Sequence, residues 1–143
     1  MANYCCTIRT NYFHVKDPER FMNLMDKVYG SESEVEVWWK NDDAGLPMFA
    51  FGTYGGIGGV LSDPDDEADE TDYDVLIDEL QHCVADDDAI LISESGEEKL
   101  RYVIGTASII TSRDYFVVDL HEEAIKKAKS MLNNQEWKTD SWY

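Results

Sequence analysis

Residues 4–30 read YCCTIRTNYFHVKDPERFMNLMDKVYG, and they join a strand pattern to a helix pattern. The run from Tyr4 to Val15 is rich in β-branched and aromatic side chains, which favour a strand. Asp17 is a good helix N-cap, and Pro18 suits the first helical position. Gly30 is expected to end this helix, and its apolar stripe consists of Phe21, Leu24, Met25 and Val28.

A hairpin is predicted on the C-terminal side of this unit. Residues 34–40 begin with alternating polar and apolar side chains, which favours a strand. Residues 41–45 have the composition of a turn, and residues 47–53 supply the paired strand. The glycines that follow, from Gly55 to Gly59, indicate a flexible or bulged crossing, because they lack the Lys-Ser/Thr ending of a phosphate-binding loop.

A second helix and a fourth strand follow. Thr71 with Asp74 three residues later resembles a capping box, so the helix is expected to begin there. Residues 86–88 have turn composition, residues 89–93 read as a strand, and Gly96 is expected to make a turn. The buried side of the helix is expected to consist of Leu76, Ile77, Leu80 and Val84.

Three more elements complete the chain. Residues 100–111 and 115–118 are predicted strands, and residues 122–132 form a predicted helix capped by Asp119. The element order is therefore β-α-β-β-α-β followed by β-β-α. The first six elements match the split, ferredoxin-like arrangement, in which two helices cover one face of an antiparallel sheet. We predict an α+β fold with a ferredoxin-like βαββαβ core and a β-β-α extension.

The length of 143 residues predicts a single domain over residues 1–143. Hydrophobic residues make up 43% of the chain, which is enough for a core despite the formal net charge of −18. An acidic loop is expected over residues 62–74. An aromatic C-terminal tail is expected over residues 133–143, with Trp137, Trp142 and Tyr143.

The net negative charge comes from one stretch of the sequence. Residues 41–98 hold 18 Asp and Glu residues and no Lys or Arg, whereas the rest of the chain holds 12 acidic and 12 basic residues. Charge segregated in this way sets a long-range field that repels nucleic acid and lipid anions and attracts surfaces built to hold phosphates. The sequence therefore indicates a basic protein as the partner, with no direct binding of nucleic acid or membrane.

The acidic run could also be an ordinary solvated surface that aids solubility. Two observations favour a partner-binding face instead: no basic residue interrupts the run, and its acids continue onto the predicted second helix and the turn after it. Adjacent Trp38 and Trp39 point to opposite faces of a strand, so one of them is either an exposed anchor or covered by a helix or the tail. The predicted partner-binding residues are Asp63, Asp65, Asp66, Glu67, Asp69, Glu70, Asp72, Asp74, Asp86, Asp87, Asp88 and Trp39.

Enzymatic and metal-binding motifs are weak in this chain. No histidine has metal-ligand spacing, and a nucleophilic pair of Cys83 with His14 has no support beyond the residue types. A calcium loop beginning at Asp63 mismatches the EF-hand, because Ala68 stands where Gly is needed and Asp74 replaces the bidentate Glu. We therefore predict no catalytic residues, no metal and no cofactor.

The sequence also favours a cytoplasmic protein. The N-terminus lacks a basic region followed by an apolar run, and no apolar stretch approaches the roughly 20 residues needed to span a bilayer. The three cysteines, Cys5, Cys6 and Cys83, include no CxxC pair, which fits a reducing compartment.

In size, acidity and aromatic edges the chain resembles the small acidic anti-CRISPR and anti-restriction proteins of phages and mobile elements, which mimic DNA. This resemblance lies in the character of residues 41–98 rather than in a motif, and both ends of the chain are charge-balanced, unlike the most extended mimics. It implies a non-enzymatic inhibitor, in the host bacterial cytoplasm, of a nucleic-acid-handling defence protein such as a CRISPR effector. The alternatives are an immunity or antitoxin protein against a basic nuclease toxin, a small ligand-binding or enzymatic ferredoxin-like domain, and a plain domain with an acidic surface.

Overall fold

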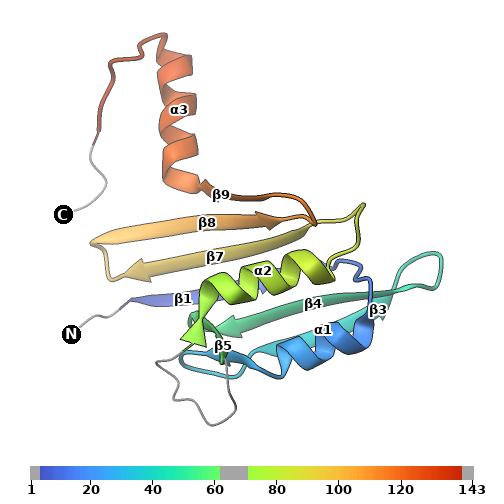
Figure 1. The fold of residues 1–143 in the computed structure, drawn as a ribbon. Helices are drawn as coiled ribbons and strands as arrows, with labels where there is room; N and C mark the ends of the chain where they lie inside the picture. Colours follow the sequence, from blue (N-terminus) through green and yellow to red (C-terminus); the bar gives the residue numbers. More distant parts are fainter. Residues whose placement is uncertain (1–3, 62–70, 140–143) are drawn as a thin grey trace.

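A six-stranded antiparallel sheet forms the body of the molecule (Figure 1). The computed structural model describes residues 4–61 and 71–139, and in this part the fold is of the α+β class with three helices. The elements in chain order are β1 (Cys5–Thr10), α1 (Pro18–Met25), β2 (Val28–Gly30), β3 (Glu36–Asn41), β4 (Pro47–Tyr54), β5 (Ile57–Leu61), β6 (Thr71–Asp72), α2 (Tyr73–Cys83), β7 (Ile90–Glu98), β8 (Tyr102–Ile110), β9 (Tyr115–Asp119) and α3 (Leu120–Leu132).

The strands of the large sheet lie in the order β3-β4-β1-β7-β8-β9, and every neighbouring pair is antiparallel. β1 therefore lies inside the sheet, between β4 and β7. A second, small sheet has the order β2-β5-β6. The edge strands of the large sheet are β3 and β9, so these two strands each have one side not paired within the sheet.

One face of the large sheet carries the core. α1 and α2 lie in front of this face in Figure 1, and their apolar side chains pack against alternate residues of β1, β4 and β7. Alternation puts the intervening side chains, such as Leu91 and Ser93 of β7, on the opposite face, where they are exposed. Buried residues of the core include Ile8, Phe49, Phe51, Ile90 and Ile92 from the strands, and Phe21, Leu24, Leu76 and Leu80 from the helices.

The first helix is shorter than the sequence pattern predicts. Asp17 caps α1 as expected, accepting hydrogen bonds from the amides of Glu19 and Arg20, but the helix ends at Met25. Val28 lies on β2 and packs against the core from that strand. The apolar spacing correctly predicted that Val28 packs against the core, but it assigned Val28 to the helix instead of to a strand. β-branched Val28 followed by Tyr29 also favours a strand.

The first strand also ends earlier than predicted, at Thr10 rather than Val15. The Asn11 side chain interrupts the ladder, because its Oδ1 accepts from the Leu91 amide at 2.8 Å and its Nδ2 donates to the Ala89 carbonyl at 3.0 Å. Beyond it the chain makes only isolated bridges to β4 and to the end of α2, at Phe13 and Val15.

Gly96 does not make the predicted turn. The strand predicted over residues 89–93 continues through it, and β7 reaches Glu98. A Cβ at Gly96 would meet the ring of Tyr4, so this glycine provides room for a side chain rather than for a turn. The chain reverses instead around Lys99, which has a positive φ of 51°.

The second helix is capped by Asp72 and not by Thr71. The Asp72 carboxylate accepts from the amides of Asp74 at 2.9 Å and Val75 at 3.2 Å, so the predicted capping box is wrong by one residue. The small sheet that leads into α2 has no counterpart in the sequence prediction. Gly59 on β5 has a φ of 125°, and a Cβ there would meet the backbone of Asp72, which explains one glycine of the cluster.

The third helix is set apart from the core. α3 follows β9 without a loop, with Asp119 as its N-cap, and none of its residues is buried. Figure 1 shows it extending away from the β9 edge of the sheet. α3 is the longest helix in the part that the structure describes, and no helix there is long and apolar enough to cross a membrane.

Candidate partner-binding surface

The predicted partner-binding acids divide into two groups. Those between residues 62 and 70, where most of the calcium loop considered from the sequence also falls, lie outside residues 4–61 and 71–139 and are not described: Asp63, Asp65, Asp66, Glu67, Asp69 and Glu70. The described ones belong to β6, to α2, to the turn after it and to β3: Asp72, Asp74, Asp86, Asp87, Asp88 and Trp39.

The solvent side of α2 carries carboxylates one helical turn apart. Asp74 is exposed in the first turn, and the side chain of Asp78 has 68% of its surface exposed. Asp72 is also exposed, but its carboxylate is held by the amides that it caps. The two carboxylates at i and i+4 are separated by a rise of about 6 Å along the helix. Asp74 and Asp78 are therefore open to a partner that approaches this face.

The three acids in the turn after α2 have different surroundings. Asp87 is exposed. Asp86 forms an ion pair with Lys16 at 3.0 Å, and the hydrogen bond and positive charge of Lys16 lower the pKa of Asp86. Asp88 is half-buried and turned toward His14. The structure thus leaves one of these acids free of ion pairs within the described part of the chain, and engages the other two.

The acidic stretch has basic neighbours in space that the sequence does not reveal. Lys16, just before α1, reaches Asp86, and Arg20 on α1 lies 3.4 Å from Glu79 on α2. Both cations lie outside residues 41–98 in the sequence. They come close to the acids because α1 packs beside α2 on the same face of the sheet. The row of acids is therefore bordered by two cations along its α1 side, which limits the acidic surface to the outer face of α2.

His14 connects three loops at one end of the sheet. Its Nε2 lies 2.7 Å from Asp42 Oδ2 in the turn between β3 and β4, and its Nδ1 lies 2.8 Å from Asp88 Oδ2 between α2 and β7. Two carboxylate partners favour the protonated ring, in which both nitrogens donate. The hydrogen bonds to Asp42 and then to Asp88 raise the pKa of His14.

The pKa values of the two carboxylates in this cluster shift in the opposite direction, downward. Amide donation from Leu46, followed by the hydrogen bond from His14, lowers the pKa of Asp42. Burial alone would raise the pKa of Asp88, but the amides of His14 and Ala89 outweigh it and lower that pKa. The cluster is an internal clamp, and it keeps both nitrogens of His14 on carboxylates rather than on Cys83.

The cysteines do not form a reactive site in the described residues. Cys83 is buried, and this burial raises the pKa of its thiol, so the thiolate nucleophile is disfavoured. Cys5 is exposed and Cys6 is half-buried, as alternation on a strand predicts. Cys6 and Cys83 form no disulfide.

The two adjacent tryptophans have different surroundings. Trp39 is 65% exposed on edge strand β3, so a partner can reach it. Trp38 is half-buried, and the Arg9 guanidinium lies 4.5 Å from the centroid of its ring. Lys40 stacks on Tyr12 nearby, with 4.3 Å between Nζ and the ring centroid. This aromatic and basic cluster lies on the sheet face opposite α1 and α2, and no pattern in the sequence pointed to it.

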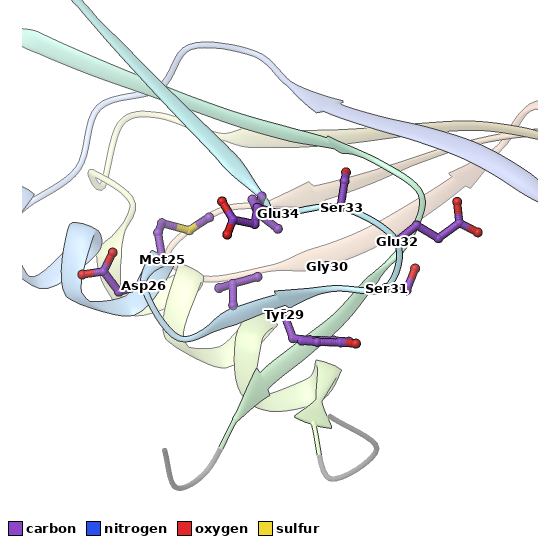
Figure 2. A pocket seen from close by; sticks show the side chains of 10 residues that line it. Met25, Asp26, Tyr29, Gly30, Ser31, Glu32, Ser33 and Glu34 are labelled. Atoms are coloured by element: carbon purple, nitrogen blue, oxygen red, sulfur yellow. The ribbon is translucent and has the colours of Figure 1, made fainter. Parts of the chain in front are cut away.

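A hollow of about 690 Å³ lies between the end of α1 and the start of β3. Figure 2 shows that its side chains do not converge: Asp26 and Glu32 point to opposite sides. Three of its lining residues are acidic and none is basic, and the segment is held by hydrogen bonds from Ser31 and Ser33 to the β4–β5 region. A hollow without converging polar groups does not define a site for a small molecule.

Within the two described ranges, no group of three or more His, Cys, Asp or Glu side chains is arranged to hold a metal ion. Comparison of the chain with protein-family models, with curated proteins and with solved structures gives no match. The candidate surface therefore stands on its own residues: exposed carboxylates on α2 and the following turn, and exposed Trp39 on β3.

Proposed function

We propose that the protein is a non-enzymatic inhibitor of a nucleic-acid-handling host-defence protein, such as a CRISPR-Cas effector. It binds through an acidic face that mimics DNA and so blocks nucleic-acid binding. The supporting observation is the concentration of 18 acids without a Lys or Arg in residues 41–98, part of which is exposed on α2 at Asp74 and Asp78. Such an inhibitor acts in the cytoplasm of the bacterial host, where its target is found.

The mechanism rests on counterion exchange. A cleft built for DNA holds cations at the spacing of phosphates, and each carboxylate that replaces a phosphate gains a comparable electrostatic energy. Association through such a face is fast and weakens with salt. Exposed Trp39 would add an apolar anchor, because tryptophan is enriched among the residues that dominate binding energies.

Charge density along the sequence suggests that residues 63–70 contribute more to binding than α2 does. One strand of duplex DNA carries a charge about every 3.4 Å of axis, whereas Asp74 and Asp78 on α2 are separated by a rise of about 6 Å. α2 alone is too sparse to imitate a strand. Residues 63–70 hold six acids among eight residues of sequence, so we expect neutralising them to weaken binding more than neutralising α2.

A ferredoxin-like relationship is part of this proposal. It is supported by the antiparallel order β3-β4-β1-β7, which brings the four predicted core strands together, and by α1 and α2 on a single face. β8, β9 and α3 then form the β-β-α extension. In this arrangement Asp74 lies in the first turn of α2, and Asp86, Asp87 and Asp88 lie in the turn after its last residue, so the described acids border both ends of one helix.

The test is affinity capture from a bacterial lysate with three baits. The wild type is compared with a loop variant in which the six acids are changed to Asn or Gln, and with a matched control that also loses six acids. The loop changes are Asp63→Asn, Asp65→Asn, Asp66→Asn, Glu67→Gln, Asp69→Asn and Glu70→Gln. The control changes, all at exposed residues outside 41–98, are Glu19→Gln, Glu34→Gln, Glu36→Gln, Glu122→Gln, Glu123→Gln and Glu136→Gln.

We expect the wild type and the control to retain a nucleic-acid-binding protein that the loop variant loses. The captured protein is then assayed for binding to labelled duplex DNA in the presence of excess inhibitor. DNA binding at full strength in that assay would show the mimicry to be wrong. Equal capture on all three baits would make the acidic run a solubility device.

The nature of the captured protein separates the main candidate from its alternative. A nuclease toxin would favour an immunity or antitoxin protein, because the same charges neutralise a basic toxin. A small-molecule or enzymatic role has less support, since the hollow between α1 and β3 lacks converging groups and the Cys83 thiol is buried.

A further inference from the structure

Large apolar side chains are exposed at the edge of the sheet opposite Trp39. They lie on the last two strands and on α3, and we call this set of residues the β9–α3 surface. Phe116 is 63% exposed and Met131 is 76% exposed, so both side chains face solvent. The residues of this surface are Val103 and Phe116, on the sheet face that α1 and α2 leave open, and Leu120, Met131 and Leu132 on α3.

α3 has the sequence of a packed helix, yet in the described part of the chain it contacts mainly the neighbouring β8 and β9, with Leu120 against Gly105. Its apolar residues occupy one side, at Leu120, Ala124, Ile125, Ala128, Met131 and Leu132, and its charged residues occupy the other. None of its 13 residues is buried. An isolated helix of this length is marginal in water, because most helical stability in proteins comes from packing of the apolar side. The helix therefore needs a surface to cover.

β9 is an edge strand without the usual protection. It is last in the sheet order, and its residues Tyr115–Val118 carry no charge, proline or bulge that would discourage pairing. An exposed apolar edge of this kind is a template for another strand. The register also aligns Leu91, Ile109 and Phe116 across β7, β8 and β9 on the face that α1 and α2 leave open.

The net charge near the β9–α3 surface favours a second copy of this chain as its partner. Residues 99–139 hold five acidic and seven basic residues, a formal charge of +2 within a chain of −18. A second copy of this chain therefore meets stronger repulsion at residues 41–98 than at this end.

We propose that the β9–α3 surface binds a second copy of this chain. The two β9 strands pair antiparallel, which joins two sheets into one, and α3 of each copy covers the open sheet face of the other. Figure 1 supports this exchange, because α3 extends past the β9 edge, into the space where a paired copy would continue the sheet. The contact is isologous, so it closes at two copies.

A register centred on Phe116 suits this pairing. It places Phe116 opposite its own copy and brings Tyr115 across from Val117, so like faces meet. It also sets Arg113 of each copy near Asp119 of the other, which gives two opposite-charge pairs. Self-complementary charge at the two ends of β9 is what an isologous strand pair requires. The proposal does not depend on the inhibitor function.

The test is the mass in solution, measured by sedimentation or light scattering at about 100 μM protein. We expect the wild type to have twice the mass of the 16.4 kDa chain. Phe116→Glu and Leu132→Glu should each be monomeric, with unchanged circular dichroism because both side chains are exposed. Trp39→Glu is the matched control, since it changes an equally exposed aromatic on the opposite edge strand, and it should remain a dimer.

Salt gives a second readout that is specific to this surface. Two chains of −18 repel at long range, so added NaCl should tighten self-association, whereas it weakens binding through the acidic face. A monomeric wild type would overturn the proposal, and if removal of residues 140–143 then produced a dimer, the tail would be the occupant. A dimer lost with Trp39→Glu but kept with Phe116→Glu would also overturn it.

Discussion

His14 hydrogen-bonds two carboxylates through its two ring nitrogens, and this couples three loops to the pH of the solution. Its pKa in the folded state is raised above the ordinary 6.5, so its contribution to stability is complete below pH 6.5 and is lost as the pH rises through the folded-state pKa. The pKa values of Asp42 and Asp88 are lowered from 3.8, so their contributions are present above that pH and lost as it falls.

We therefore expect the free energy of unfolding to be highest between pH 3.8 and 6.5 as far as this cluster is concerned. Urea unfolding at about pH 5.5 and about pH 8.5 measures the decline on the alkaline side. His14→Gln should flatten the decline. Parallel pH curves for His14→Gln and the wild type would rule out this clamp.

Gly96 shows a different residue-scale effect, because it makes room for the Tyr4 ring. Tyr4 donates a hydrogen bond to Glu94 at 2.7 Å and stacks on Tyr102. Gly96→Ala should displace this ring and destabilise the protein by about 1–3 kcal/mol in urea unfolding, the usual cost of overpacking. The cost should largely vanish in a Tyr4→Ala background. Gly56→Ala, whose added Cβ makes only an ordinary contact 3.4 Å from Ser31 Oγ, is the control.

At the scale of elements, α1 and α3 have equivalent caps and very different consequences. Asp17 caps a helix whose Phe21, Leu24 and Met25 are buried, whereas Asp119 caps a helix in which no residue is buried. Asp17→Ala should lower the global free energy of unfolding by about 1 kcal/mol. In the Phe116→Glu background, which removes any contact between copies, Asp119→Ala should leave urea unfolding of the core unchanged and accelerate amide hydrogen exchange in the first turn of α3. Equal effects on global stability would contradict the separation of α3 from the core.

Local signals explain which elements the sequence could predict. Asp17-Pro18, the 86–88 turn and Asp119 act through neighbouring residues, and each was predicted correctly. The end of α1, the continuation of β7 through Gly96 and the small sheet depend on residues far away in sequence, such as Tyr4 at Gly96. A local sequence pattern contains no information about these long-range contacts. It therefore predicts most of the helices and strands but not where they end.

The candidate site shows the same limit. The sequence identified the acids of α2 and its flanking turn, and the structure leaves Asp74 and Asp87 exposed. It did not reveal that Lys16 and Arg20 lie beside Asp86 and Glu79, because those pairings arise from the packing of α1 against α2. The absence of basic residues from a stretch of sequence is therefore not the same as their absence from a surface.

On the scale of the whole molecule, the formal charge of −18 destabilises the folded state through repulsion between like charges. Raising NaCl from about 20 mM to about 500 mM shortens the Debye length from roughly 20 Å to roughly 4 Å. We expect the melting temperature to rise over this range, and to rise less in the variant with six neutralised loop acids. A melting temperature that stays flat for the wild type would argue against a concentrated acidic face.

The interior position of β1 has a consequence for how the chain acquires its structure. β1 is made early, yet its ladders are with β4, about 45 residues later, and with β7, where Cys5 pairs with Glu97. The loops that close these ladders are long, so the nucleus has high contact order and folding should take milliseconds to seconds rather than microseconds. During synthesis β1 stays unpaired on its β7 side until that strand has left the ribosome, and a chain released before it would expose the open edge of β1 in the middle of the future sheet.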